Sequence, residues 1–540
     1  MTKLSKIRLH EILSQRFATG FKKLSDIPNP ELLHDGIKSA KRIASAIQNS
    51  EKIYIVGDYD VDGVTSTALM IEFFRAIGYP VEATIPNRFT DGYGVSAKII
   101  DRIEADVVIT VDNGINAFEA AEKCKERGID LIITDHHTPS ATLPEAFAIV
   151  DPKLDQCEYP FKEICGAQVA WLLMALIKKE INSSVNLAQF IDLLSLAIVA
   201  DVMPLQDINR TLVIKGLTMM STSTRPCFVI IRDMLAKKHL SAEDIGFQIA
   251  PRINSAGRME DASIALKFLT APNENIAYQQ YQTLNELNNI RKATEAEASE
   301  HAMMQVHPDD NIIVVAHEGW HEGVVGIVAS RLVGKFGKPA IVLSIDKGEG
   351  EMVNGEWKEP ESFAKGSARS IGNINIYDFI KEQEGYLERF GGHKMAAGLG
   401  LKESSIQAFK EAINNDAQSI PEEDYIPQEE IMGELAENAI DFELLTLLES
   451  FEPFGEANPR PRFLAKDAII TAVRKLGADK AHTKLTIKLS QHATQSYDLM
   501  YFRCDDEFRT GESITCSYTL NKNTYNGKSS IQFMLDKVIK

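Results

Sequence analysis

Short apolar runs and longer helical patterns alternate along the first half of the chain. Five of the runs have the length and composition of buried strands. They are residues 52–56, 81–86, 106–111, 130–134 and 146–150. Helical patterns follow, beginning near Val64, Asn116 and Gly166. This alternation predicts an α/β fold, with a parallel sheet that is covered by helices on both faces.

Helical patterns dominate the middle of the chain. Two long apolar patterns cover residues 168–179 and 187–202, and we expect each to form one helix. Residues 273–306 contain no Gly or Pro and are rich in helix formers, which predicts a single long helix joining two domains. A second, smaller α/β unit follows, with strands at 311–316 and 340–344 and a helix at 323–336. It ends near Asn415.

The last part of the chain changes character twice. Residues 420–458 are acidic and contain Pro, which is typical of a linker. Beyond them, short alternating runs such as HTKLTIKLS and SSIQFMLDKV predict an all-β domain, most simply a small barrel. The predicted segments are therefore 1–50, 51–270, 271–307, 308–416, 417–457 and 458–540.

The net charge of −18 is unevenly distributed along the chain. Residues 458–540 carry 14 Lys and Arg against 8 Asp and Glu, a net charge of +6, so the remainder carries −24. A basic module can bind phosphates within an acidic protein because salt screens the more distant charges. The overall acidity therefore does not exclude a nucleic-acid partner.

Two further features bear on the cellular compartment. The six cysteines form no C-x-x-C pair, so we expect reduced, mostly buried thiols rather than disulfides or a zinc site. The N-terminal residues interrupt their apolar positions with charge and contain no signal-peptide core. We therefore expect a cytoplasmic protein without a membrane segment.

Polar side chains gather where the predicted strands end. The stretch VGDYDVDG places three Asp within five residues, directly after the run 52–56. Two later runs end in VDNG and TDHH, and the helical pattern 187–202 ends in ADVMPL. Because the carboxyl ends of parallel strands meet at one edge of a sheet, these loops can converge. The side chains concerned are Asp58, Asp60, Asp62, Asp112, His136, His137 and Asp201.

This set of side chains favours divalent cations. A single D-x-D is more often a helix cap or a solvated loop, but polar motifs at three strand ends favour a shared site. Clustered carboxylates are costly unless a cation neutralises them. Carboxylates with imidazole suit Mn²⁺ or Mg²⁺ better than zinc. Two such cations sharing a bridging carboxylate would clamp a phosphate and activate water, which predicts a metal-dependent phosphoesterase.

The same motifs, in the same order, carry a family resemblance. DYDVDG, VDNG, TDHH and ADVMPL resemble the DHH phosphoesterase superfamily, and RFGGHKMAAG resembles its associated DHHA1 domain. PNRFTDGYG, PRINSAGRM and HEGVVGIVASRL resemble the RecJ family of single-strand-specific DNA exonucleases. PFGEANPRPRF and the β-rich tail resemble the entry into that family's OB-type barrel. The resemblance covers nearly the whole chain from Glu51. It implies a DHH domain, a connecting helix, a DHHA1 domain and an OB-type domain.

The resemblance also assigns roles to the clustered side chains. Asp60 and Asp112 would hold one cation, with Asp58 as an additional candidate ligand. The second cation would be held by Asp62, Asp112, His136 and Asp201. Asp112 would therefore bridge the pair, and His137 would contact the scissile phosphate. Val56 stands where some superfamily members have a metal-binding His, so one filled site is supported more firmly than two.

Other motifs concern the substrate. Arg88 and Arg258 lie in Gly-containing segments read as loops, where a guanidinium can bind a phosphate with two hydrogen bonds. The resemblance implies that they bind the terminal 5′ phosphate, and the alternative is an ion pair at the surface. Tyr93 either stacks on a base or belongs to the core. In GGHKMAAG the expected substrate contacts are Gly391, Gly392 and His393, and the alternative is a plain sheet turn.

As a whole, the resemblance implies a 5′ to 3′ exonuclease of single-stranded DNA that uses two divalent cations, Mn²⁺ or Mg²⁺. It would release mononucleotides in recombination and repair, as a monomer that meets a single-strand-binding protein and a helicase. The basic and aromatic residues of 458–540 would form a single-strand platform, or else a solvated basic face. One alternative is a phosphodiesterase of oligoribonucleotides or cyclic dinucleotides, and another is a non-catalytic scaffold. The basic tail counts against the first, and the nearly complete ligand set counts against the second.

Overall fold

We describe the protein from a computed structural model of the 540-residue chain. The described residues are 3–17, 19–348, 351–353, 356–358, 361–427, 430–477, 480–491, 493–502, 506–525 and 528–539. Five cysteines in these ranges are buried free thiols, and Cys504 lies outside the described residues. Each helix in the described ranges is too short or too polar to span a lipid bilayer.

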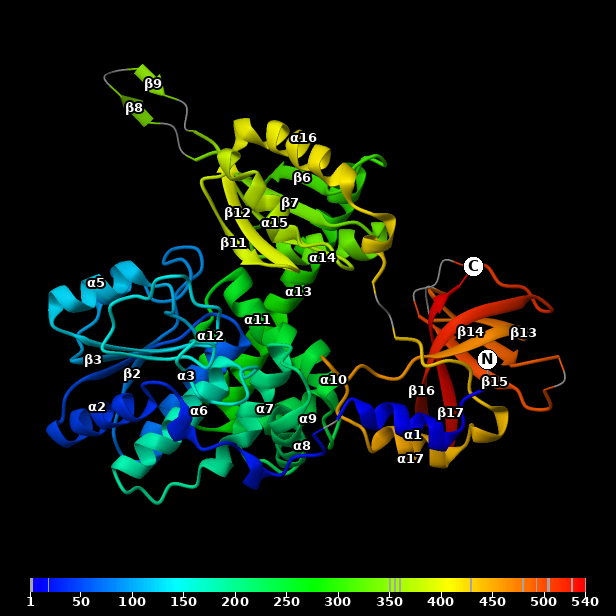
Figure 1. Ribbon diagram of the computed structural model, residues 1–540, viewed down its shortest axis with the longest axis horizontal. Coiled ribbons are helices and arrows are strands. Elements are labelled where there is room, and N and C mark those ends of the chain that lie inside the picture. Colours follow the sequence, from blue (N-terminus) through cyan, green and yellow to red (C-terminus); the bar gives the residue numbers. More distant parts are fainter. Residues whose placement is uncertain are drawn as a thin grey trace.

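A five-stranded parallel sheet with helices on both faces forms the first domain and confirms the predicted fold class (Figure 1). Its strands are β1 (Ile53–Val56), β2 (Glu82–Thr84), β3 (Val107–Val111), β4 (Asp130–Thr134) and β5 (Ala148–Val150). They are ordered β2–β1–β3–β4–β5. One face packs on α2 (Gly36–Asn49), α3 (Val61–Ala76) and α6 (Gly166–Glu180), and the other on α4 (Ala97–Arg102) and α5 (Phe118–Arg127). Because both faces are covered, β3 is buried along its whole length, which explains its continuous apolar sequence.

A group of helices follows the sheet. The pattern at 187–202, predicted as one helix, is divided into a 3-10 turn (Leu187–Phe190) and α7 (Ile191–Ala200). Asn186 starts the turn by accepting a hydrogen bond from the backbone N–H of Ala188. The predicted bounds were therefore wrong, because local capping groups set the ends and periodicity does not register them. The remaining helices are α8 (Asp207–Met220), α9 (Pro226–Leu235), α10 (Ala242–Asp244), α11 (Ala250–Met259) and α12 (Ser263–Leu269).

A single long helix, α13 (Glu274–Met304), connects this domain to a second sheet, as predicted. The sheet contains β6 (Ile313–Glu318), β7 (Ala340–Asp346), β10 (Phe363–Arg369), β11 (Arg389–His393) and β12 (Ala396–Lys402). Its order is β11–β12–β10–β7–β6, with β6 and β7 parallel and the other neighbours antiparallel. The helices of this domain are α14 (Val325–Phe336), α15 (Ile376–Glu382) and α16 (Ile406–Asp416). β8 (Glu351–Val353) and β9 (Glu356–Lys358) pair separately.

The C-terminal part forms a closed barrel, as predicted. Its strands are β13 (Phe463–Leu476), β14 (His482–Lys488), β15 (Tyr497–Tyr501), β16 (Ser513–Tyr525) and β17 (Lys528–Val538). They close in the order β13–β14–β15–β17–β16. Each strand pairs with two neighbours, although β15 and β17 pair over only two residues each.

The core of the barrel extends beyond the barrel itself. α1 (Lys6–Gln15) and α17 (Phe442–Glu449) lie side by side against it (Figure 1) and bury Leu9, Leu13, Leu444 and Leu448 there. The segment 417–457, expected as a linker, therefore contains a packed helix whose apolar stripe is concealed by its acidic composition. The segment 1–50 is likewise divided, since α1 joins the barrel and α2 joins the first sheet. The domain boundaries drawn from the sequence stay predictions.

Candidate metal centre and nucleic-acid cleft

The loop after β1 carries the first carboxylates. Asp58 is buried, and Asp60 caps α3 by accepting a hydrogen bond from the backbone N–H of Gly63 at 3.0 Å. A Cβ at position 63 would lie 2.6 Å from the Asp58 backbone, so only glycine allows this close approach. The loop can therefore fold back over the start of the helix and hold both carboxylates at the carboxyl edge of the sheet.

Asp62 is fixed by the start of another helix. Its two oxygens accept hydrogen bonds from the backbone N–H groups of Gly166 at 2.6 Å and Ala167 at 2.9 Å, in the first turn of α6. A helix N-terminus attracts negative charge, so α6 stabilises this carboxylate inside the protein.

Asp112 follows β3 in a left-handed backbone conformation, with a φ of 64°. Few residues with a side chain adopt this conformation, and Asn and Asp tolerate it best. The buried carboxylate packs against Gly166, where a Cβ would lie 2.4 Å from its Oδ1. The backbone turn at Asp112 and the absence of a side chain at Gly166 together make room for the carboxylate at the centre of the site.

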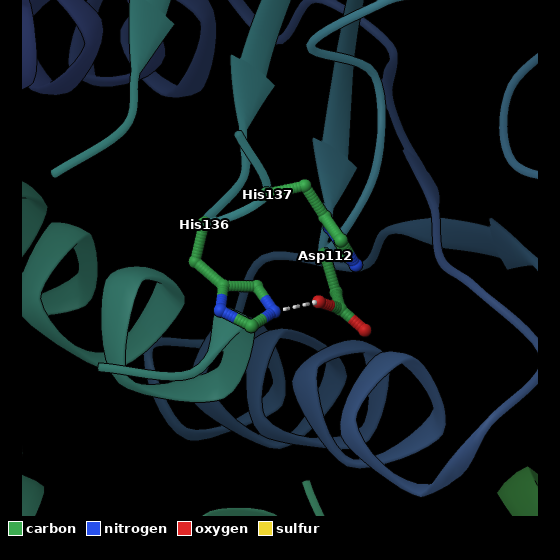
Figure 2. Close-up of side chains that lie close together, drawn as sticks. All are labelled: Asp112, His136 and His137. Atoms are coloured by element: carbon green, nitrogen blue, oxygen red, sulfur yellow. Dashed lines mark ion pairs between the residues drawn. The ribbon is translucent and has the colours of Figure 1, made fainter. Parts of the chain in front are cut away.

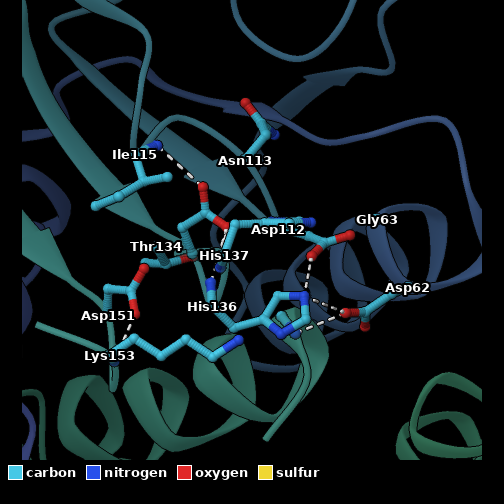
Figure 3. A network of polar contacts seen from close by, with 12 residues as sticks. Asp62, Gly63, Asp112, Asn113, Ile115, Thr134, His136, His137, Asp151 and Lys153 are labelled. Carbon is cyan, nitrogen blue, oxygen red and sulfur yellow. Dashed lines mark hydrogen bonds and ion pairs between the residues drawn. The ribbon is translucent and has the colours of Figure 1, made fainter. Parts of the chain in front are cut away.

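His136 joins the carboxylates, as Figures 2 and 3 show. Its Nε2 lies 3.2 Å from Oδ1 of Asp112, 3.6 Å from Oδ2 of Asp201 and 3.7 Å from Oδ2 of Asp62. Burial lowers the pKa of His136 to about 4, despite the neighbouring carboxylates. The imidazole is therefore neutral at neutral pH, the form that can ligate a metal.

The structure brings the predicted ligands together in three groups. In each group the candidate ligand atoms lie within 4.8 Å of one another. The first contains Asp58, Asp60 and Asp112, the second contains Asp62, His136 and Asp201, and the third contains Asp112, His136 and His137. The third group therefore links the first, through Asp112, to the second, through His136. The assignment of individual ligands to individual cations stays a prediction.

The hydrogen bonding and the pKa values of these side chains fit a bound divalent cation. Among the carboxylate oxygens of these groups, three buried atoms have no hydrogen-bond partner in the described part of the chain: Oδ1 of Asp58, Oδ1 of Asp112 and Oδ2 of Asp201. Burial, with neighbouring carboxylates, raises the pKa of Asp58 and Asp112 well above the ordinary value and that of Asp201 to about 9. Buried, mutually repelling carboxylates need a compensating charge, and oxygen donors with one imidazole suit Mn²⁺ or Mg²⁺.

His137 is held by a residue that the sequence analysis did not select. Oδ1 of Asp135 lies 2.7 Å from His137 Nδ1, and Oδ2 accepts a hydrogen bond from the backbone N–H of Ile115 at 2.9 Å. Burial lowers the pKa of His137, but the Asp135 carboxylate outweighs it and raises the value to about 9. His137 is therefore protonated at neutral pH. The sequence could have identified Asp135 by its position in TDHH, between the end of the strand and the two histidines.

A cleft of about 1120 Å³ opens between the first and second sheets, beside His137. Of the predicted substrate residues, it is lined by Arg88, Tyr93, Gly391 and Gly392. His393 lies at the end of β11 and is not part of this lining. The sequence analysis missed further lining residues. Among them are Ser367 and Arg369, on a strand (β10) without a recognisable motif, and Arg389, which begins β11 within RFGGHKMAAG but was not selected there. Tyr93 is 56% exposed, which argues against a purely structural core role.

Arg258 was predicted in a loop, and this was wrong, because INSAGR forms the end of α11. Gly257 permits the helix at this point, since a Cβ there would lie 2.7 Å from the Tyr59 carbonyl oxygen. The glycine thus serves close packing of the helix against the loop after β1, and it does not mark a turn. The Arg258 guanidinium donates from Nη1 to the Gly323 carbonyl oxygen at 3.0 Å, which ties α11 to the second α/β domain.

Arg88, Arg258 and Arg369 form a group of cations at the cleft. Burial lowers the pKa of Arg258 to about 10, and the positive charges of Arg88 and Arg369 act in the same direction. Arg88 lies over the Tyr59 ring, 5.4 Å from its centre. Among the described residues, no carboxylate forms an ion pair with any of the three guanidinium groups. Their mutual repulsion would be relieved by a bound anion such as a phosphate.

The barrel carries fewer available cations than its sequence suggested. Arg460 pairs with Glu243 at 2.7 Å, Arg462 with Asp536 at 3.4 Å and Lys484 with Asp498 at 2.7 Å. Among the aromatic candidates, Phe502 is 51% exposed and contacts His482 edge-on, with 5.0 Å between the ring centres. The side chain of Tyr525 lies outside the described residues.

Comparison with known proteins gives matches to three family models. They are the DHH family N-terminal domain at residues 52–198, the DHHA1 domain at 309–419 and the RecJ OB domain at 431–537. Curated proteins described as single-stranded-DNA-specific exonuclease RecJ are 35% identical in Bacillus subtilis, 32% in Haemophilus influenzae and 30% in Escherichia coli. These alignments cover 92%, 95% and 93% of this chain. The chain spans 62% of the B. subtilis relative but 92% and 89% of the other two.

Solved structures give the same picture. The crystal structure of RecJ from Thermus thermophilus in complex with Mn²⁺ matches with a TM-score of 0.79 and 27% identity. The match covers 94% of this chain and 72% of that one. A crystal structure of exonuclease RecJ bound to manganese matches with a TM-score of 0.61 and 31% identity, over 73% of this chain and 96% of that one.

Proposed function

This chain belongs to the RecJ family of single-stranded-DNA-specific exonucleases, and on that premise we propose that it hydrolyses single-stranded DNA from its 5′ end. The reaction breaks phosphodiester bonds, depends on divalent cations and releases mononucleotides. The observation that supports this most directly is the set of ligand groups linked by Asp112 and His136, beside a cleft lined by arginines.

The residues of the metal centre would have different roles in the reaction. Two cations, Mn²⁺ or Mg²⁺, would polarise the scissile phosphate and activate water for in-line attack. Asp112 would bridge them, and the neutral imidazole of His136 would complete the second ligand group. His137, protonated at neutral pH, would donate from Nε2 to a phosphoryl oxygen and stabilise the negative charge that develops there. Asp135 would hold the His137 ring in this orientation through Nδ1.

The arginines at the cleft support a preference for the end of a strand. A terminal 5′ phosphate carries more negative charge than an internal one, and Arg88, Arg258 and Arg369 would compensate it. Bidentate guanidinium–phosphate hydrogen bonds would fix the end of the strand relative to the metal centre. Tyr93, exposed in the same cleft, would stack on a base. Gly391 and Gly392 would let β11 approach the backbone of the strand closely, and His393 stays a candidate contact at its end.

The test is digestion of single strands labelled at either end, in Mn²⁺, Mg²⁺ or chelator, beside the matching duplex. We expect labelled mononucleotides from the 5′ end of the single strand alone, and no digestion in chelator. Digestion of the duplex at a similar rate, or release from the 3′ end first, would contradict the proposal.

The alternative is a phosphodiesterase of very short oligoribonucleotides or cyclic dinucleotides, and the barrel discriminates between the two. Deleting residues 458–540 is a poor test, because α1 and α17 share the barrel core and would be left exposed. Phe502→Ala removes one exposed aromatic ring instead. We expect about fivefold weaker binding of a long single strand, consistent with roughly 1 kcal/mol of stacking, and unchanged hydrolysis of a dinucleotide. Equal binding of long strands by both proteins would favour the small-substrate alternative.

The Asp135–His137 pair gives a prediction for pH dependence. Asp135→Asn removes the carboxylate that raises the pKa of His137, so His137 loses its proton at lower pH. We expect kcat to fall about tenfold near neutral pH and the alkaline limb of the pH–rate profile to move to lower pH. Asp130→Asn is a matched control, because Asp130 begins the same strand, β4, at the opposite edge of the sheet and pairs there with Arg42. An unmoved alkaline limb in Asp135→Asn would remove the positioning role.

The wider setting follows from family membership. We propose that the protein acts as a monomer in the cytoplasm, where a helicase and a single-strand-binding protein supply its substrate. Light scattering on the purified chain tests the first point, and digestion of duplex DNA with and without a helicase tests the second. A stable dimer, or no stimulation by the helicase, would contradict the respective point.

A further inference from the structure

The loop that follows Asp201 adopts a strained conformation. α7 ends at Ala200, Asp201 caps it, and residues 202–206 lead into α8. Val202 has a φ of 55°, in the left-handed region that is unfavourable for a β-branched side chain. Such a conformation persists only where surrounding contacts over-determine it. The loop must therefore be held firmly from elsewhere.

Part of the support comes from the loop's own domain. Asn209, at the start of α8, donates from its side-chain amide to the Pro204 carbonyl oxygen at 3.1 Å. The same amide donates to the Glu163 carbonyl oxygen at 2.8 Å, and its oxygen accepts a hydrogen bond from Gln168 at 2.8 Å. These contacts fix the middle of the loop but leave Leu205 and Gln206 to be held from outside.

The remaining support comes from the barrel side. We call residues 450–458, which connect α17 to the barrel, the strut. The Leu205 N–H donates to the Glu456 carbonyl oxygen at 2.8 Å. The Gln206 amide donates to the carbonyl oxygens of Ala457 at 2.9 Å and Arg16 at 3.1 Å. One side chain therefore joins the loop, the strut and the end of α1.

The strut is itself rigidly built. Asn458 is fully buried and donates to two carbonyl oxygens within the strut, at 2.8 and 2.9 Å. Arg210, on α8, donates to two more, at 2.7 and 3.1 Å, and its guanidinium lies over the rings of Phe17 and Phe21. Leu205 packs closely on Gly455, where a Cβ would lie 2.7 Å from its Cδ1. The strut thus fits the loop without spare room.

We propose that the strut positions Asp201 for metal binding, with Gln206 and Leu205 as the positioning residues. Asp201 Oδ2 lies 3.6 Å from His136 Nε2, inside the second ligand group, and metal ligands tolerate displacements of only a few tenths of an ångström. The packing of the barrel and the strut against the first domain would then set the affinity of the site for the cation that Asp201 holds. This inference rests on the proposed function, namely on Asp201 being a ligand.

The test is Mn²⁺ binding to the full chain, measured by electron paramagnetic resonance and calorimetry. Gln206→Ala removes two hydrogen bonds to the strut and α1, and Gly455→Ala places a Cβ against Leu205. For both we expect about tenfold weaker binding of one Mn²⁺ ion, with the other ion unaffected. We also expect kcat to fall for a short single strand while KM stays the same.

The matched control is Lys6→Ala, which removes the Lys6–Glu443 contact between α1 and α17 without touching the strut or the loop. It should bind Mn²⁺ like the wild type. Unchanged Mn²⁺ binding in both test variants, or an equal loss in the control, would overturn the inference. Asp201→Ala distinguishes a failure of the proposed metal centre from a failure of the strut's positioning role. If it still binds both ions, the proposed centre is wrong; if it loses one ion while the test variants keep both, only the role of the strut is wrong.

Discussion

Replacing Asp112 by Asn is expected to slow hydrolysis of single-stranded DNA by at least about 10³-fold, or roughly 4 kcal/mol of transition-state stabilisation. Asp112 belongs to one ligand group with Asp58 and Asp60 and lies 3.2 Å from His136 of the other. Losing its charge therefore weakens both groups at once. Asn is preferred to Ala because it tolerates the φ of 64° at this position. The measurement is the initial rate of mononucleotide release from a 5′-labelled strand at saturating Mn²⁺.

Two comparisons separate a chemical effect from a structural one. In chelator, Asp112→Asn should melt at a temperature no lower than the wild type, because it removes a buried charge beside other carboxylates. Asp106→Asn is the matched control, since Asp106 lies at the opposite end of the same strand and accepts a hydrogen bond from the Lys52 N–H at 2.7 Å. It should hydrolyse DNA normally. Activity retained in Asp112→Asn would remove the proposed bridge between the two cations.

Arg88→Ala is expected to abolish most of the preference for a 5′ phosphate. The wild type should degrade a 5′-phosphorylated strand roughly 10- to 150-fold more efficiently than the same strand with a 5′ hydroxyl, the effect of one hydrogen bond between charged groups. Arg88 belongs to the group of cations at the cleft and forms no ion pair with a carboxylate among the described residues. Its removal should lower kcat/KM for the phosphorylated strand and leave the hydroxyl strand nearly unchanged. The measurement is kcat/KM for the two strands with each protein.

The control for this prediction is Arg75→Ala. Arg75 lies at the far end of α3, in an exposed ion pair with Glu72, so its loss should not change the ratio of the two rates. Equal losses on both strands in Arg88→Ala would indicate a general backbone contact. An undiminished preference would show that Arg258 and Arg369 bind the terminal phosphate without Arg88.

Much of the fold could be predicted from local patterns. The strands β1 to β5 were found because buried parallel strands are short, continuous apolar runs, and α13 was found because no Gly or Pro interrupts it. The patterns failed where non-local contacts decide the structure. α17 was concealed within acidic sequence, and its buried leucines have meaning only against the barrel core. The helix 187–202 was too long because a side-chain cap and a left-handed residue set its ends.

In the candidate site, too, local patterns predicted some residues, and non-local contacts decided the others. The seven clustered side chains could be selected because each follows a strand or helix end, and topology brings such ends to one edge of a sheet. Asp135 was passed over although it lies in the same motif, since its role depends on the direction of its hydrogen bond to His137. Arg369 was missed because nothing in the sequence of β10 shows that it faces Arg258 across the domain boundary.

By itself, the sequence determined which chemistry this protein can contain. Carboxylates and imidazoles at the ends of buried strands are costly without a cation, and that cost is a property of residue types and order. Only the tertiary structure decided the geometry: which oxygens lack partners, that Arg88 and Arg369 from separate segments line one cleft near Arg258, and that the barrel side holds the loop of Asp201. These facts depend on distances between residues far apart in the chain, and no local pattern encodes them.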